Sequence, residues 1–349
     1  MATALASLAF GIELELLLQP VPEKIGQLKA CGFQDKDSCT EAEKANNCLI
    51  ICQWIVGLLS PLSVPAGLST GTYATWTVAD EPVLSETKGY WRCEVVSRIL
   101  QTADDWKREI RVVLGAIGQD FVIDLTKGCA MHVHVSSGPD MRFSASQLKQ
   151  VIKGVIYYDR ALIKIMPPSC KENQYCMPNT LRIARWGTLY ENVPQNSWNT
   201  AFNECDQGNL IQHVLLAHRL DENSGTIEFR GLSGVLNAAD ANHWVGVTLG
   251  FINAALAKNW NDVKFTNAYP TSDQLRAAIR YGVQMLGPNC QGALGLMEDD
   301  NRPPRIANAA ELAIINAKKA AIGNKKSKFV EKIINSRPNT PNAPVTVYG

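Results

Sequence analysis

The chain has 349 residues, of which 46% are hydrophobic, and its 34 basic side chains nearly balance its 33 acidic ones. This is enough apolar material for a sizeable core, and a formal net charge of +1 gives no global attraction for nucleic acid or an anionic membrane. We therefore expect a protein that binds neither, and any attraction for an anionic ligand must be local. No targeting segment stands out in the sequence, so we also expect a soluble, cytoplasmic protein.

The first predicted strand runs from Phe10 to Leu18, where every second residue from Phe10 is apolar and the residues between them are Gly11, Glu13, Glu15 and Leu17. Residues two apart in a strand point to the same face of a sheet. Glu13 and Glu15 therefore project together on one face, while the intervening apolar side chains face the core.

The segment 37–65 is predicted to be a helical insertion. Its longest apolar run, from about Leu49 to Leu59, is well short of the roughly 20 residues that a membrane-spanning helix needs, so it predicts a buried helix. The ten cysteines are scattered along the chain, several of them within apolar runs, and we expect them to be free thiols.

Two later strands repeat the pattern of one polar face. In the segment 91–96, Glu94 alternates with apolar residues. A predicted helix at 104–119 and a strand at 121–125 follow. In the segment 131–136, three apolar residues alternate with His132, His134 and Ser136.

Helices and one more strand complete the predicted elements. A serine followed three residues later by glutamine resembles a capping box at the start of a helix over 144–165. The strand around 226–230 carries Glu228 and Arg230 on one face, and further helices are predicted from Asp240, from Thr271 and over 309–321. The segment 321–349 is a basic tail rich in proline and asparagine.

These elements predict an α+β fold with an antiparallel or mixed sheet. Parallel strands that are buried on both faces are continuously apolar, whereas these strands alternate. The glycine-rich segment 287–295 matches neither common nucleotide-binding fingerprint.

If the strands share one sheet, its open face presents four carboxylates, two histidines and an arginine. Like charges so close together need a cation between them. Carboxylate ligands with one imidazole suit magnesium or manganese, and magnesium commonly shares its coordination shell with substrate phosphates. The pattern therefore predicts phosphoryl chemistry on a nucleotide, in which Arg230 stabilises the charge of the transition state.

Five motifs in this order resemble the amidoligase family of the carboxylate–amine ligase group, which includes glutamine synthetase and glutamate–cysteine ligase. They are Gly11–Glu15, Trp76–Asp80, Glu94–Ser97, Gly128–Ser136 and Gly225–Arg230. The resemblance runs from about Phe10 to about Trp260. It implies a curved antiparallel sheet of about six strands with helices on its outer face, as in glutamine synthetase and guanidino kinases. It also implies a single catalytic domain over 1–320.

The resemblance further implies an ATP- and magnesium-dependent (or manganese-dependent) ligase. The substrate carboxylate takes the γ-phosphate of ATP, and an amine then displaces phosphate from the acyl phosphate to give an amide. The substrates would be small carboxylates and amines, such as amino acids or peptides, and relatives suggest a homo-oligomer.

Carried over motif by motif, the resemblance implies roles for eight residues. One metal is bound by Glu13, His132 and Glu228, and a second by Glu15 and Glu94. The nucleotide is contacted by His132, Ser136 and Arg230, and His134 lies either beside the nucleotide or in support of the sheet. The catalytic residues are Glu94 and Arg230, to which we add His218 as a candidate that no family motif supplies.

Some of these assignments leave alternatives. His218 lies where the family has a different strand sequence, so it is either the base that deprotonates the amine or a strand-pairing residue. Arg182 and Arg185 are either anion clamps or surface cations, and Asp80 is a weaker candidate for holding the amine. The competing functions are a guanidino-kinase-like phosphotransferase, a degenerate nucleotide-binding protein and a metal hydrolase.

Overall fold

The computed structural model describes most of the chain between residues 7 and 317. The described residues are 7–35, 39–68, 73–82, 84, 89–126, 128–139, 141–172, 198, 200, 202–203, 226–263, 269–303, 308, 310–311, 313 and 317. They form two compact units, which we describe separately. The first comprises Met1–Leu14, Ile99–Leu114 and Ala130–Ile306, and the second comprises Glu15–Arg98, Gly115–Cys129 and Ala307–Gly349.

Strand β1 (Ala9–Pro20) belongs to the first unit up to Leu14 and to the second unit from Glu15. In the first unit it pairs antiparallel with β5 (Leu100–Gln101) and β7 (Ala130–Ser136), and β7 pairs antiparallel with β8 (Ile227–Ser233). Glu13 lies opposite His132 in this ladder.

The β7–β8 ladder contains an irregularity next to His132. Met131 pairs with Leu232 and Val133 pairs with Phe229, so one residue of β7 opposes two residues of β8, Arg230 and Gly231. This is the geometry of a β-bulge, which bends a strand and changes the direction of its side chains.

The second unit contains the remaining strands. There, β2 (Ala66–Leu68) runs parallel to β3 (Trp76–Ala79), and β3 pairs antiparallel with β4 (Trp91–Val96). The end of β1 pairs antiparallel with β6 (Phe121–Asp124). The strand order is β2-β3-β4-β1-β7-β8, and both β5 and β6 pair with β1.

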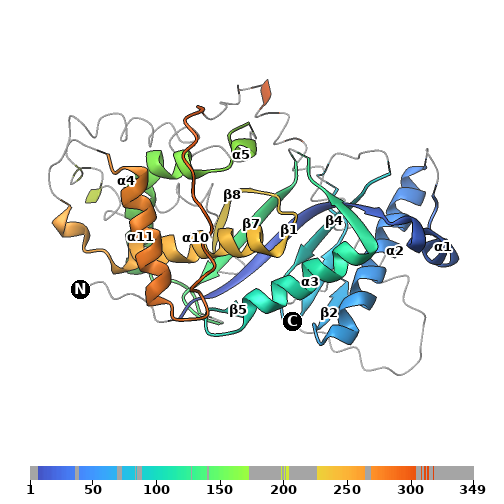
Figure 1. The fold of residues 1–349 in the computed structure, drawn as a ribbon. Helices are drawn as coiled ribbons and strands as arrows, with labels where there is room; N and C mark the ends of the chain where they lie inside the picture. Colours follow the sequence, from blue (N-terminus) through green and yellow to red (C-terminus); the bar gives the residue numbers. More distant parts are fainter. Residues whose placement is uncertain are drawn as a thin grey trace. The chain divides into compact units, whose positions relative to one another are not determined.

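In the first unit, three long helices pack on one another: α4 (Ala145–Ile165), α10 (Ala238–Ala257) and α11 (Ser272–Met285). Helices α10 and α11 cross in contact with each other (Figure 1), and Gly250 and Gly282 lie close together at the crossing. A Cβ atom on Gly282 would overlap the carbonyl oxygen of Gly250, so only glycine fits there. The side-chain amide of Asn253 donates a hydrogen bond to the carbonyl of Gly282 at 3.2 Å across the same crossing.

Two short helical elements are also described in the first unit. They are α5 (Pro168–Glu172) and the 3-10 helix η3 (Trp260–Asp262). Helix α3 (Trp106–Asp120) begins in the first unit and ends in the second.

Helix α2 (Glu41–Leu59) of the second unit packs against β2, β3 and β4 and continues into the 3-10 helix η1 (Ser60–Leu62); the unit also contains α1 (Pro22–Ala30). Helix α2 is longer than the apolar run of about Leu49 to Leu59 that predicted a buried helix here. Among the described residues, 41–62 is the one helix whose length and composition would allow it to cross a membrane, and 44% of its most apolar window is buried inside the protein. Core helices of soluble proteins meet the same criterion.

The α+β class is confirmed, and within the described residues the sheet has eight strands where about six were expected. The two shortest strands, β2 and β5, have three and two residues and are too short to show alternation. The glutamine-synthetase-like arrangement and the single domain over 1–320 stay predictions. All eight described cysteines are free, as expected. The tail 321–349 lies outside the described residues.

Candidate functional site

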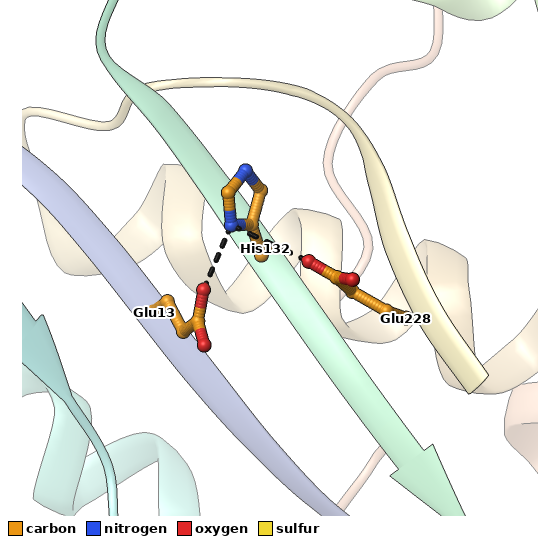
Figure 2. Close-up of side chains that lie close together, drawn as sticks. All are labelled: Glu13, His132 and Glu228. Carbon is orange, nitrogen blue, oxygen red and sulfur yellow. Dashed lines mark hydrogen bonds and ion pairs between the residues drawn. The ribbon is translucent and has the colours of Figure 1, made fainter. Parts of the chain in front are cut away.

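The polar face of the first unit gathers side chains from β1, β7 and β8. Figure 2 shows Glu13 on β1, His132 on β7 and Glu228 on β8, with the ring of His132 between the two carboxylates. Nδ1 of His132 lies 2.8 Å from Oε2 of Glu13 and 3.7 Å from Oε1 of Glu228, and Nε2 points away from both (Figure 2). One ligand atom from each residue lies within 4.8 Å of the other two.

Burial sets the charge of His132. The residue is 4% exposed, and this burial lowers its pKa below the ordinary value, although the hydrogen bond with Glu13 acts in the opposite direction. The ring is therefore neutral at neutral pH, which is the form that binds a metal.

Glu13 stays ionised although it is largely enclosed. Burial acts to raise its pKa, but the interactions with His132 and His134 outweigh burial and hold the pKa well below its usual value. A carboxylate beside a neutral imidazole is a ready pair of ligands for a divalent cation.

His134 lies next to the same two carboxylates. Its Nε2 is 3.2 Å from Oε1 of Glu13 and 3.7 Å from Oε1 of Glu228, and its Nδ1 is 3.1 Å from the hydroxyl of Thr226. Burial acts to lower the pKa of His134, but the contact with Glu13 and the charges of both carboxylates raise it above the ordinary value. The two histidines thus have opposite pKa shifts.

Arg230 and Ser136 border this group. Arg230 lies in the β-bulge, and its guanidinium donates to Oε1 of Glu228. The Ser136 hydroxyl donates to the carbonyl of Gly138 at 2.9 Å and is 3.5 Å from the carbonyl of Ala9. The nucleotide contacts predicted for Ser136 and the histidines stay predictions.

A second acidic group lies in the second unit. Oxygen atoms of Glu15, Glu81 and Glu94 all lie within 4.8 Å of one another, and Glu81 is 1% exposed. Sequence reasoning missed Glu81, because it lies beyond the end of β3, where strand alternation no longer tells which side chains point together. Its position directly after Asp80 in the Trp76–Asp80 motif was the available signal.

Asp80 is engaged elsewhere. Its two oxygens accept hydrogen bonds from Nε and Nη2 of Arg92 at 3.1 and 3.2 Å, and both side chains are nearly buried. Burial raises the pKa of Asp80, and Arg92 opposes that rise. Asp80, which we expected as a weaker candidate for holding the amine, is therefore already paired with an arginine.

The donor atoms fit the metals that the sequence predicted. Oxygen-rich sets with at most one imidazole suit magnesium and manganese, whereas zinc prefers more nitrogen or sulfur. In each group, acidic side chains are brought together where their mutual repulsion is costly unless a cation offsets it.

Three candidates cannot be placed. His218, Arg182 and Arg185 lie outside the described residues, so their roles stay predictions.

Comparison with known families places the chain in a described family. A family model described as "Putative amidoligase enzyme" matches residues 6–252, which is more than half of the chain and includes both acidic groups. The comparison with curated proteins found no match.

Proposed function

The chain belongs to the amidoligase family, and from this premise we propose that it is an ATP-dependent carboxylate–amine ligase that uses magnesium or manganese. The observation that supports the proposal most directly is the group formed by Glu13, His132 and Glu228. It places an ionised carboxylate, a neutral imidazole and a second acid within ligand distance of one another.

The proposed reaction has two steps. A carboxylate oxygen of the acid substrate attacks the γ-phosphorus of ATP, the bond from that phosphorus to the β–γ bridging oxygen breaks, and ADP leaves. The amine nitrogen then attacks the carbonyl carbon of the acyl phosphate, the C–O bond to phosphate breaks, and phosphate leaves as the amide forms. The proton lost by the amine needs a base, for which His218 is the candidate.

The first unit supplies the residues for the nucleotide. Glu13, His132 and Glu228 would hold a divalent metal, which when bound neutralises phosphate oxygens and so makes the γ-phosphorus easier to attack. Arg230 already lies beside Glu228, and its guanidinium would stabilise negative charge that develops on the transferred phosphoryl group.

In the second unit, we assign Glu15, Glu81 and Glu94 to a further divalent metal. Their close approach and the burial of Glu81 support this assignment. Glu94 was predicted from the sequence both as a ligand and as a catalytic residue, and its place in this group supports the ligand role.

We propose small carboxylates and amines as substrates, with amino acids and peptides as the first to test, and a cytoplasmic homo-oligomer as the working form. The amide product requires a free acid and a free amine, and both occur in these compounds.

The test begins with calorimetric titration of the full chain with a non-hydrolysable ATP analogue, with and without magnesium. We expect binding that requires the metal. Pools of acids and amines are then assayed for ADP, free phosphate and amide. A phosphorylated substrate with no free phosphate would show that the protein is a kinase and not a ligase. Hydrolysis of an amide in the absence of ATP, with no release of phosphate, would show that it is a metal hydrolase.

Two variants complete this test. Glu228→Gln keeps the size of the side chain but removes the charge, and we expect it to abolish ATP turnover. Glu23→Gln makes the same chemical change at an exposed residue of α1 that belongs to neither acidic group, and it should leave turnover intact. Equal turnover by both variants would contradict the metal assignment.

A further inference from the structure

His134 is held between a hydroxyl and two carboxylates. On one side, its Nδ1 lies 3.1 Å from Oγ1 of Thr226. On the other, its Nε2 lies 3.2 Å from Oε1 of Glu13 and 3.7 Å from Oε1 of Glu228. The strand register explains this arrangement, because His134 is directly opposite Glu228 and Thr226 precedes Glu228 by two residues.

The partners define how the ring is protonated. Ionised carboxylate oxygens only accept hydrogen bonds, so Nε2, which faces Glu13 and Glu228, carries a proton. When the ring is neutral, Nδ1 is then left with a lone pair, and the Thr226 hydroxyl donates to it.

The contact on the carboxylate side does not fix the ring by itself. Nε2 of His134 is buried and has no hydrogen bond of good geometry within the described part of the chain, although Glu13 is close. The imidazole ring can turn about its Cβ–Cγ bond unless a directional contact stops it. The hydrogen bond with Thr226 is the directional contact available to His134.

The two oxygens of Glu13 face different histidines. Oε2 lies beside His132, within the group of candidate ligands, and Oε1 lies beside His134, which is not part of that group. His134 therefore contacts the carboxylate on the side that is not directed at His132. Such outer contacts orient metal-binding carboxylates.

We propose that Thr226 is a positioning residue for the metal: its hydroxyl holds the ring of His134, and the ring orients the Glu13 carboxylate toward His132 and Glu228. This inference rests on the proposed function, because it requires a divalent metal at Glu13. It deepens that function by assigning His134 and Thr226 to the support of the ligands.

The test measures Mn²⁺ binding to the full chain by electron paramagnetic resonance. Thr226→Val keeps the shape and β-branching of the side chain but removes the hydroxyl. We expect Mn²⁺ to bind about tenfold more weakly, at the lower end of the 10–100-fold that loss of an outer partner costs. Thr226→Ser restores the hydroxyl and should restore most of the affinity.

Thr248→Val is the matched control. Thr248 is fully buried in α10, and its hydroxyl has no hydrogen-bond partner within the described residues. The same chemical change there should leave Mn²⁺ affinity unchanged.

A second measurement needs no metal. In ¹⁵N NMR spectra of the metal-free protein, the Nδ1 resonance of His134 should move toward that of an unbonded ring nitrogen in Thr226→Val and return in Thr226→Ser. Thr226→Ala takes the place of the valine variant if the latter does not fold, as judged by thermal unfolding.

The outcomes separate the two hypotheses. If the wild type binds Mn²⁺ in a Glu13-dependent way but Thr226→Val binds it equally well, or the Nδ1 resonance does not move, the positioning role is wrong and the proposed function stands. Equal loss in the valine and serine variants also overturns the role of the hydroxyl. A wild type that binds no Mn²⁺ overturns the metal assignment and this inference together.

Discussion

Glu13 and His132 lie directly opposite each other in the β1–β7 ladder, and their side chains meet at 2.8 Å. This cross-strand pair is the centre of the candidate metal group, because Glu228 approaches the same ring nitrogen from β8. Glu13→Gln should weaken Mn²⁺ binding by more than the roughly 10–100-fold that loss of an outer partner costs.

The change in Mn²⁺ affinity is measured by titrating the protein with Mn²⁺ and monitoring the free ion by electron paramagnetic resonance. Glu23→Gln is the control, since it removes one exposed carboxylate from α1. If Glu13→Gln bound Mn²⁺ as tightly as the wild type, Glu13 would not be a ligand.

The two histidines of β7 should titrate on opposite sides of the ordinary histidine pKa of about 6.5. Burial lowers the pKa of His132, and the neighbouring carboxylates raise that of His134. In the metal-free protein, lowering the pH should therefore protonate His134 before His132. NMR titration of the ring protons checks this order.

The stability contributions of these histidines have opposite signs. His134, with a raised pKa, stabilises the fold below pH 6.5, and this contribution is lost as the pH rises through its folded pKa. His132, with a lowered pKa, costs stability as the pH falls below 6.5. Glu13→Gln should remove the upward shift of His134, and an unchanged His134 titration in this variant would contradict the assigned cause.

The ion pair of Asp80 and Arg92 should matter for folding. Its side chains are 9% and 13% exposed, so Arg92→Met leaves a nearly buried carboxylate without its partner. Breaking a buried pair in this way costs about 3–5 kcal/mol, and we expect about 3 kcal/mol because the pair is not fully enclosed. Denaturant unfolding at neutral pH measures the loss.

The pH dependence of this loss tests its cause. The folded-state pKa of Asp80 is already raised by burial and should rise further without Arg92, so protonation of Asp80 at low pH relieves the cost. The difference between Arg92→Met and wild type should therefore narrow as the pH falls. An equal difference at all pH values would indicate lost packing instead.

The crossing of α10 and α11 should not tolerate a side chain at its closest point. Gly282→Ala places a methyl group against the carbonyl of Gly250, and we expect a loss of about 3 kcal/mol, at the upper end for an overpacked core. Gly118→Ala in α3 meets nothing within 4 Å and should stabilise the protein by up to about 1 kcal/mol through helix propensity. Thermal unfolding of both variants checks the contrast.

The sequence by itself determined which side chains share a face within each strand. In β1, Gly11, Glu13 and Glu15 are half-buried and the residues between them are buried, as the alternation predicted. This works because the side-chain period of a strand is two and does not depend on its neighbours. The main helices were predicted for a similar reason, since capping boxes and apolar periodicity are local signals.

Only the tertiary structure decided which residues meet across strands. The register that sets Glu13 against His132, the bulge opposite His132 and the pairing of Asp80 with Arg92 depend on how separate segments pack. The place of Glu81 beside Glu15 and Glu94 also needed the tertiary structure, because Glu81 lies past the end of β3. Alternation fixes the direction of a side chain along its own strand, whereas register and bulges follow from contacts between segments that lie far apart in the sequence.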